Sequence, residues 1–307
     1  MTTDKPQEKT LVVILGATAT GKTDIGIRLA QAFRSEIISS DSRQIYREMS
    51  IGTAKPTAEE LAAVPHHFIG TRSVTEDYSA GRYEEEALQC IEELFRRHDI
   101  LFLVGGSGLY IDALCNGMDA LPQTDPALRQ QLTRELEQQG LEALTLRLRD
   151  LDPIYYGQVD RANPQRIIRA LEVCLQTGKP YSSLRKQTVK QRPFRILKIG
   201  IRMPRTQLYE RIDRRVIQMM EQGLEEEVRS LIPLRHYNAL QTVGYKELFE
   251  FFDGKISREE AVSLIQRNSR RYAKRQETWF RRDPETVWME GNAFCAEKIE
   301  KYLREFV

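Results

Sequence analysis

Short, continuous runs of apolar residues mark the positions of the predicted strands. They lie at 11–15 (LVVIL), 36–40 (EIISS), 100–104 (ILFLV) and 196–201 (ILKIGI). An uninterrupted apolar run is typical of a strand buried on both faces of a parallel sheet. A helical pattern over 22–33 follows the first run. Strands separated by helices predict an α/β fold with a parallel sheet flanked by helices.

Strand signals disappear between residues 122 and 187. This segment reads as helices, and its clearest helix has Asp125 as the capping residue, Pro126 in the first turn and an end at Gly140. Because a strand signal returns afterwards, we interpret 122–187 as an all-helical insertion domain. The catalytic core then comprises residues 1–121 and 188–307, and its C-terminal part is mostly helical.

Composition narrows the class of protein without naming a partner. The chain has 307 residues, 41% of them hydrophobic and 29% charged, and a formal net charge of +2. These values are ordinary for a globular protein with one large domain or a core and a smaller domain. We find neither a secretory signal nor a membrane-length apolar run, and the four cysteines form no CxxC pair. We therefore expect a cytoplasmic protein with reduced cysteines and no membrane partner.

Residues 16–23 read GATATGKT, which fits the phosphate-binding pattern G-x-x-x-x-G-K-[ST] between a buried strand and a helix. In such a loop, backbone amides and the helix N-terminus point at one anion. Lys22 adds a cation, and the Thr23 hydroxyl can bind Mg²⁺. The motif predicts a ligand with two linked phosphates and does not specify a nucleotide. The candidate diphosphate-binding residues are Gly16, Ala17, Thr18, Ala19, Thr20, Gly21, Lys22 and Thr23.

Asp41 directly follows the second predicted strand. Ligands of open α/β sheets bind at the carboxyl ends of the strands, so Asp41 should lie near the phosphate-binding loop. Its residue type allows three roles: a magnesium ligand, a general base, or the cap of a helix that 42–49 suggests. The residues alone leave these three roles open.

Two segments concentrate positive charge. Residues 185–215 contain eleven Lys and Arg but only two acids. The second segment, 267–282, reads as a helix, and its basic residues occupy one arc of roughly 140° on that helix. Tyr272 and Trp279 lie beside this arc and are expected to pack into the core. These basic residues are Arg267, Arg270, Arg271, Lys274, Arg275, Arg281 and Arg282. A cationic face suits a nucleic-acid backbone, although a solvated helix face is the alternative.

Six sequence blocks in this order resemble the bacterial tRNA dimethylallyltransferases (tRNA isopentenyltransferases). They are DSRQIY from 41, IGTAKP from 51, VGGSGLY from 104, PQRIIRALEV from 164, VGYKE from 243 and KRQETW from 274. The resemblance covers roughly residues 11–282. The chain differs from the usual family pattern at Ala17, Thr20 and Ser107. None of these differences removes a backbone amide, and Ser107 retains the hydroxyl of the usual threonine.

The resemblance implies a P-loop NTPase-like core and a definite reaction. The family transfers dimethylallyl from dimethylallyl diphosphate to N6 of the adenosine at tRNA position 37, and pyrophosphate is released. It implies that Asp41 is the catalytic base, that Arg215 joins the loop in binding the diphosphate, and that Mg²⁺ on Thr23 stabilises the leaving group. It also implies tRNA as a partner, gripped at the anticodon stem-loop by the insertion domain, and we expect a monomer. The candidate tRNA-binding residues are Asp41, Ser42, Arg43, Gln44, Ser107, Arg129, Gln165, Arg166, Ile167, Ile168 and Arg169.

Three other functions are compatible with parts of the sequence. The phosphate-binding loop would also suit a small-molecule or nucleotide kinase. An enzyme that prenylates free adenine nucleotides would share the donor site. A nucleotide-gated RNA-binding protein would share the loop and the basic clusters without any chemistry. The DSRQ and IGTAKP blocks disfavour the kinase, and the helical insertion and basic arc favour a macromolecular acceptor.

Overall fold

The computed structural model describes residues 9–119, 121–123, 125–186 and 188–306. The chain divides into two compact units, which are described separately. The first joins the residues up to Cys115 to those from Gln191, and the second runs from Asn116 to Lys190, so it extends beyond the expected 122–187 at both ends. The backbone N–H of Lys190 donates to the carbonyl of Asn116 at 2.8 Å. The chain therefore enters and leaves the second unit at neighbouring points.

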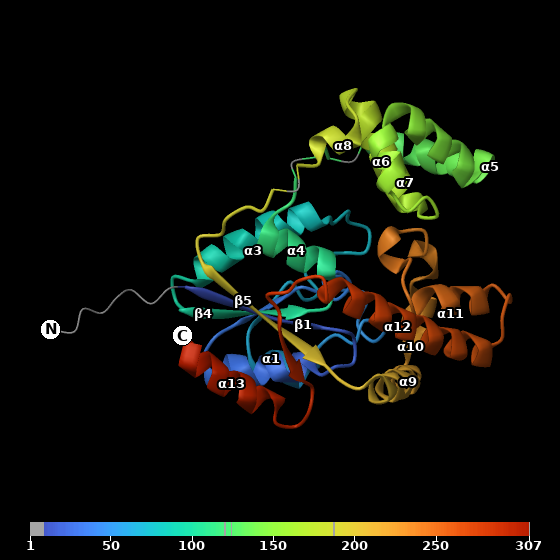
Figure 1. Ribbon diagram of the computed structural model, residues 1–307. Coiled ribbons are helices and arrows are strands. Elements are labelled where there is room, and N and C mark those ends of the chain that lie inside the picture. The colour runs from blue at the N-terminus through green and yellow to red at the C-terminus, as the bar shows by residue number, and fades with distance from the viewer. Residues whose placement is uncertain (1–8, 120, 124, 187, 307) are drawn as a thin grey trace. The chain divides into compact units, whose positions relative to one another are not determined.

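The first unit is built on a six-stranded sheet in the order β3-β2-β4-β1-β5-β6, in which all paired strands are parallel (Figure 1). The strands are β1 (Thr10–Gly16), β2 (Ile37–Ser39), β3 (His66–His67), β4 (Ile100–Gly105), β5 (Arg195–Arg202) and β6 (Val287–Glu290). Every residue of β1 and β4 is buried, as continuous apolar runs require of central strands. The α/β class and the four predicted strands are confirmed. The sequence analysis missed the short edge strands β3 and β6, which have no long apolar run.

Helices cover both faces of this sheet (Figure 1). On one face lie α1 (Lys22–Ala32) and α13 (Cys295–Phe306), and on the other lie α3 (Ala80–Leu94) and α4 (Gly108–Asn116). The apolar sides of α1 and α13 and the strands form one core cluster, in which Val12, Phe102 and Ile199 are fully buried. This core fixes the carboxyl ends of the strands, where the candidate site lies.

A second group of helices in the same unit lies beyond the carboxyl end of β5 (Figure 1). Its elements are α9 (Arg205–Glu221), α10 (Leu224–Ser230), α11 (Tyr245–Phe252), α12 (Arg258–Phe280) and the 3₁₀ turns Ile232–Leu234 and Asn238–Leu240. These helices share an apolar cluster with Ile45, Tyr46 and Met49 from the segment after β2. The short α2 (Ala58–Ala63) begins with a capping box formed by Thr57 and Glu60. The helix expected over 42–49 does not form; that segment consists of turns.

Helices are the only regular secondary structure among the described residues of the second unit. It contains α5 (Pro126–Leu151), α6 (Pro153–Gln158), α7 (Pro164–Thr177) and α8 (Tyr181–Leu184). Asp125 caps α5 by accepting the amides of Ala127 and Leu128, as predicted. Gly140, with φ 80°, interrupts α5, and the helix resumes after it, so the expected end is a kink. Leu132, Leu148 and Leu171 are buried in this unit's own core.

The four cysteines are free thiols, and three of them are buried. No helix among the described residues is both long and apolar enough to cross a membrane.

Candidate active site

A cavity of about 610 Å³ lies where β1, β2 and β4 end, and every residue that lines it belongs to the first unit. One side is formed by the phosphate-binding loop and the start of α1, and another by residues 39–44 and 52–56. Helices α9 and α12 complete the wall with Arg215, Tyr272 and Gln276, among others. The structure thus brings together segments from both ends of the chain, as the position of ligand sites in open α/β sheets predicts.

The phosphate-binding loop leads directly into α1. Gly21 precedes the helix, and no side chain caps the helix N-terminus. The residues where the loop joins the helix all line the cavity, namely Gly21, Lys22, Thr23 and Asp24. The unpaired amides of a helix N-terminus bind anions, because their partial positive charges point along the helix axis into the site. The end of the loop and the start of α1 thus place a helix N-terminus at the cavity, and diphosphate binding there stays a prediction.

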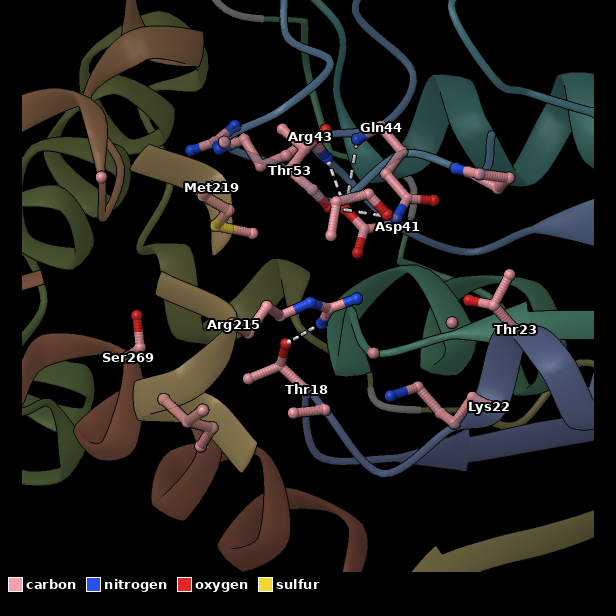
Figure 2. Close-up of a pocket in the computed structure, with 18 of the residues that line it drawn as sticks. Thr18, Lys22, Thr23, Asp41, Arg43, Gln44, Thr53, Arg215, Met219 and Ser269 are labelled. Carbon is pink, nitrogen blue, oxygen red and sulfur yellow. Dashed lines mark hydrogen bonds between the residues drawn. The ribbon is translucent and has the colours of Figure 1, made fainter. Parts of the chain in front are cut away.

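Two cationic side chains, Lys22 and Arg215, lie at this loop. Lys22 Nζ donates to the Ala17 carbonyl at 2.6 Å, and an Arg215 Nη1–H donates to Thr18 Oγ1 at 3.3 Å (Figure 2). Burial and the neighbouring Arg215 lower the pKa of Lys22 to about 7, although Asp41 opposes the shift. Burial also lowers the pKa of Arg215 from its usual range. Burial is the main cause of both shifts, and an anion bound beside either group would raise its pKa again.

Gln276 of α12 ties this loop to the end of β4, a contact that the sequence analysis missed. Its Oε1 accepts the Thr18 backbone amide at 2.8 Å, and its Nε2 donates to the Gly106 carbonyl at 2.7 Å. The side chain is buried, with 6% of the residue exposed. The Thr18 amide is therefore engaged within the protein, and its partner is a side chain and not a ligand. The KRQETW block contains Gln276, but no spacing rule assigns it this role.

Asp41 caps a turn with one of its two carboxylate oxygens. Its Oδ1 accepts the amides of Arg43 at 2.9 Å and Gln44 at 3.2 Å. Oδ2 has no hydrogen-bond partner among the described residues. Figure 2 shows Asp41, Arg215 and Lys22 around one hollow. Of the three roles left open for Asp41, capping is thus observed, but on a turn and not on a helix. The second oxygen, Oδ2, remains available to accept a proton or to bind a metal.

Three of the other polar candidates already bond to the protein. Ser107 Oγ accepts the Ser42 amide at 2.8 Å and donates to Ser42 Oγ at 3.0 Å. Gln44 Nε2 donates to the carbonyls of Thr53 at 3.1 Å and Ala54 at 3.0 Å. These bonds leave acceptor positions on Gln44 and the serine hydroxyls for a ligand. The Arg43 side chain lines the same cavity.

The basic segment 185–215 does not form one surface. Arg192 pairs with Glu84 at 2.9 Å, and both side chains are 7% exposed; Lys198 pairs with Asp283 at 2.6 Å. The sequence alone does not reveal these ion pairs, because the acidic partners are far away along the chain. Helix α12 does present a basic exposed face, formed by Arg267, Arg271, Lys274 and Arg275. Tyr272 is exposed and lines the cavity, contrary to the expected core position. Trp279 is partly buried and donates to Asp112 at 2.9 Å.

In the second unit, two of the tRNA-binding candidates are held by a buried acid. Glu172 is fully buried and bonds to Arg129 through both of its oxygens. Arg169 lies 3.4 Å from the same carboxylate and donates to the Pro122 carbonyl at 2.8 Å. Both arginines are therefore engaged in ion pairs with Glu172.

The remaining candidates on α7 divide by exposure. Gln165 and Arg166 are exposed, and Arg166 has no acidic partner in the part of the chain that the structure describes. The side chains of Ile167 and Ile168 are buried in the core of this unit. Packing accounts for both isoleucines, so α7 offers an RNA ligand its polar residues rather than these two.

The cavity has oxygen donors suited to magnesium. Mg²⁺ prefers oxygen ligands, keeps several waters and commonly combines one or two protein groups with ligand phosphates. Thr23 and Asp41 both line the cavity, and Asp41 Oδ2 is free to bind. Among the described residues there is no group of three or more His, Cys, Asp or Glu that could hold a metal by itself. Magnesium fits here as an ion shared with a diphosphate.

Comparisons with known proteins agree on one family. The family model described as IPP transferase matches residues 44–283. A tRNA dimethylallyltransferase of Porphyromonas gingivalis is 54% identical over 287 residues, which cover 94% of this chain and 96% of that protein. A tRNA dimethylallyltransferase of Cytophaga hutchinsonii is 52% identical, and the match covers 91% of this chain and 92% of that protein.

Solved structures give the same result. The tRNA isopentenylpyrophosphate transferase of Bacillus halodurans superposes with a TM-score of 0.70 at 38% identity, covering 97% of this chain and 95% of its own. A eukaryotic dimethylallyltransferase, described as acting on tRNA, superposes with a TM-score of 0.76 at 26% identity and covers 97% of this chain and 78% of its own. These likenesses confirm the predicted P-loop NTPase-like core. The chain belongs to the IPP transferase family, the family of the tRNA dimethylallyltransferases.

Proposed function

We propose that this chain is a cytoplasmic, monomeric enzyme that transfers dimethylallyl from dimethylallyl diphosphate to N6 of the adenosine at tRNA position 37. One observation carries the proposal: a single cavity joins a phosphate-binding loop with two cations to a carboxylate with one free oxygen. The relatives are tRNA dimethylallyltransferases, which disfavours the kinase alternative.

The donor binds through its diphosphate. The amides at the start of α1, Lys22 and Arg215 hold the diphosphate oxygens, and the charge that develops on the leaving pyrophosphate is stabilised there. Mg²⁺ held by Thr23, with Asp41 in reach, would neutralise part of that charge. Because these groups line the cavity before the donor enters, little reorganisation is needed during the reaction.

The transfer exchanges a carbon–oxygen bond for a carbon–nitrogen bond and moves one proton. The adenine N6 attacks the allylic carbon as the bond from that carbon to the diphosphate oxygen breaks, and the electron pair leaves with pyrophosphate. The N6 proton passes to Asp41 Oδ2, while Oδ1 remains bonded to the turn amides. An exocyclic amine conjugated to a ring is a weak nucleophile, so a positioned base accelerates its attack. The adenine has to leave its stack to reach the cavity.

The tRNA is bound by cationic side chains in both units. On α12, the exposed basic face contacts phosphates, and on α7 Gln165 and Arg166 contact the anticodon stem-loop. The eukaryotic relative's action on tRNA supports a macromolecular acceptor. Because such contacts are mainly electrostatic, the affinity for tRNA should fall steeply with salt.

The experiment pairs donors with acceptors. The purified protein is incubated with dimethylallyl diphosphate and unmodified tRNA, and pyrophosphate release and the masses of digested nucleosides are measured. We expect isopentenyl-adenosine in the tRNA and none when adenosine monophosphate is the acceptor. Phosphoryl transfer from ATP would instead indicate a kinase, and tRNA binding without pyrophosphate release would indicate a binding protein.

A further inference from the structure

The carboxylate of Glu227 binds three consecutive backbone amides of the segment that lines the cavity. Glu227 lies in α10, and its Oε2 accepts the amides of Ser50 at 2.9 Å and Ile51 at 2.8 Å. Its Oε1 accepts the amide of Gly52 at 3.0 Å. These residues are about 175 positions away along the chain. No described cation forms an ion pair with Glu227, so the backbone of this segment is its main partner.

Tyr245 completes the cluster. Its hydroxyl donates to Glu227 Oε1 at 2.7 Å, which gives the carboxylate four donors. The tyrosine ring also lies against Gly52, where an added Cβ would come within 2.6 Å of a ring carbon. Four charge-assisted hydrogen bonds nearly exhaust the lone pairs of a carboxylate, so they define the position of this segment tightly.

Hydrogen bonds connect this anchored segment to Asp41. Thr53 and Ala54 follow the anchored amides directly, and their carbonyls accept the side-chain amide of Gln44. The backbone amide of Gln44 in turn donates to Asp41 Oδ1. The path therefore runs from the Glu227 carboxylate through residues 50–54 and Gln44 to the carboxylate of Asp41. Figure 2 shows its last part, with Thr53, Gln44 and Asp41 side by side.

We infer that Glu227 is a positioning residue for prenyl transfer: it fixes residues 50–54 so that Gln44 holds Asp41 in the orientation that accepts the N6 proton. The inference rests on the proposed function, because it assigns Glu227 a task in that reaction. Glu227 does not line the cavity, so its effect would be exerted through Asp41. Removing a hydrogen bond from this path should lower the rate of the chemical step more than it lowers the affinity for the donor. The reason is that small displacements of a catalytic group reduce rates strongly.

The test compares Glu227→Gln with Glu226→Gln. The glutamine retains one acceptor oxygen but turns an NH₂ group toward backbone N–H groups that need an acceptor. Glu226 is exposed on the same helix and supplies the matched control. Tyr245→Phe removes one of the four donors and leaves the amides, so it should have a smaller effect. We expect kcat to fall about 10–100-fold in Glu227→Gln, with the KM for dimethylallyl diphosphate within about threefold of the wild type.

Hydrogen exchange provides a local readout that is independent of activity. The amides of Ser50, Ile51 and Gly52 should exchange faster in Glu227→Gln than in the wild type, and at the wild-type rate in Glu226→Gln. The unfolding midpoints of the two variants should be similar. A wild-type kcat in Glu227→Gln, or a change confined to KM, overturns the inference and leaves the proposed function standing. Failure of the wild type itself to transfer the prenyl group would overturn both. If Glu227→Gln does not fold, the same comparison of kcat and exchange is decided with Tyr245→Phe.

Discussion

The side-chain oxygen of Gln276 accepts the backbone amide of Thr18 at 2.8 Å, although the two residues are 258 positions apart. This bond makes α12 a support of the phosphate-binding loop. Gln276→Leu would leave the Thr18 amide and the Gly106 carbonyl without partners, at a cost of about 1–3 kcal/mol for each buried group. We expect weaker pyrophosphate binding by calorimetry and a lower unfolding midpoint. An unchanged affinity for pyrophosphate in Gln276→Leu would contradict the support role.

Asp41→Asn tests proton acceptance by Asp41 separately from its capping of the turn. The asparagine oxygen can still accept the amides of Arg43 and Gln44, but the side chain no longer takes up a proton. Single-turnover prenyl transfer should slow by about 10²–10⁴-fold, while tRNA affinity changes by no more than a few-fold. Asp41→Ala should lose transfer as well and also destabilise the turn. A variant that keeps more than about a tenth of the wild-type rate would exclude the catalytic role.

The pKa of Lys22 predicts how donor binding depends on pH. In the free protein this pKa is lowered to about 7, and a bound diphosphate should raise it. Binding therefore takes up a proton near neutral pH and above, and the affinity for pyrophosphate should fall as pH rises above about 7, by at most about tenfold per unit. Titrations in buffers of different ionisation enthalpy measure the uptake.

Lys22→Met is the control for that experiment, because the ionisation of pyrophosphate itself also changes with pH. This variant should bind more weakly and show only the ligand's own pH dependence. Identical pH profiles for Lys22→Met and the wild type would show that Lys22 does not take up the proton.

Two arginines of the helical unit should behave differently on replacement by alanine. Arg129→Ala leaves the fully buried Glu172 without its main partner, which should destabilise this unit by about 3 kcal/mol or more. Arg166→Ala removes an exposed cation without an acidic partner among the described residues. It should leave stability unchanged, weaken tRNA binding and reduce the salt dependence by about one phosphate contact. Thermal unfolding and binding across a salt series test both; unchanged tRNA affinity in Arg166→Ala would remove it from the interface.

A deletion should separate the two substrates. Because every residue lining the cavity lies outside Asn116–Lys190, bridging 116 to 190 by a short linker should preserve pyrophosphate binding and abolish tight tRNA binding. Calorimetry with pyrophosphate and filter binding with tRNA measure the two effects. Normal prenylation by the deletion variant would show that the helical unit does not grip the tRNA, and α12 would become the leading candidate.

The sequence predicted the features that depend on local pattern. The runs LVVIL and ILFLV identified β1 and β4 because both faces of these strands are buried. The loop motif placed Lys22 and Thr23 in the cavity because its geometry is local. The helix expected over 42–49 was wrong because Asp41 caps a turn and the residues after it bond to other segments, among them Ser107 and Gly70.

Residues that act across long sequence separations were not predictable. Gln276 and Glu227 have ordinary polar positions on their helices, and only the fold shows that they bind loops 170 or more positions away. Arg192 seemed part of a cationic surface because its acid, Glu84, is 108 positions earlier. A single sequence contains no pairing information at such distances.

The bond between Lys190 and Asn116 also bears on how this family can diversify. A segment whose ends already meet can be lengthened, shortened or exchanged without moving the elements on either side, and the entropic cost of a longer loop rises only slowly with its length. Strand β5 would keep its register with β1 whatever helices were inserted before it. Under the proposed function, contacts with the tRNA can therefore change in this segment while the elements around the diphosphate site keep their places.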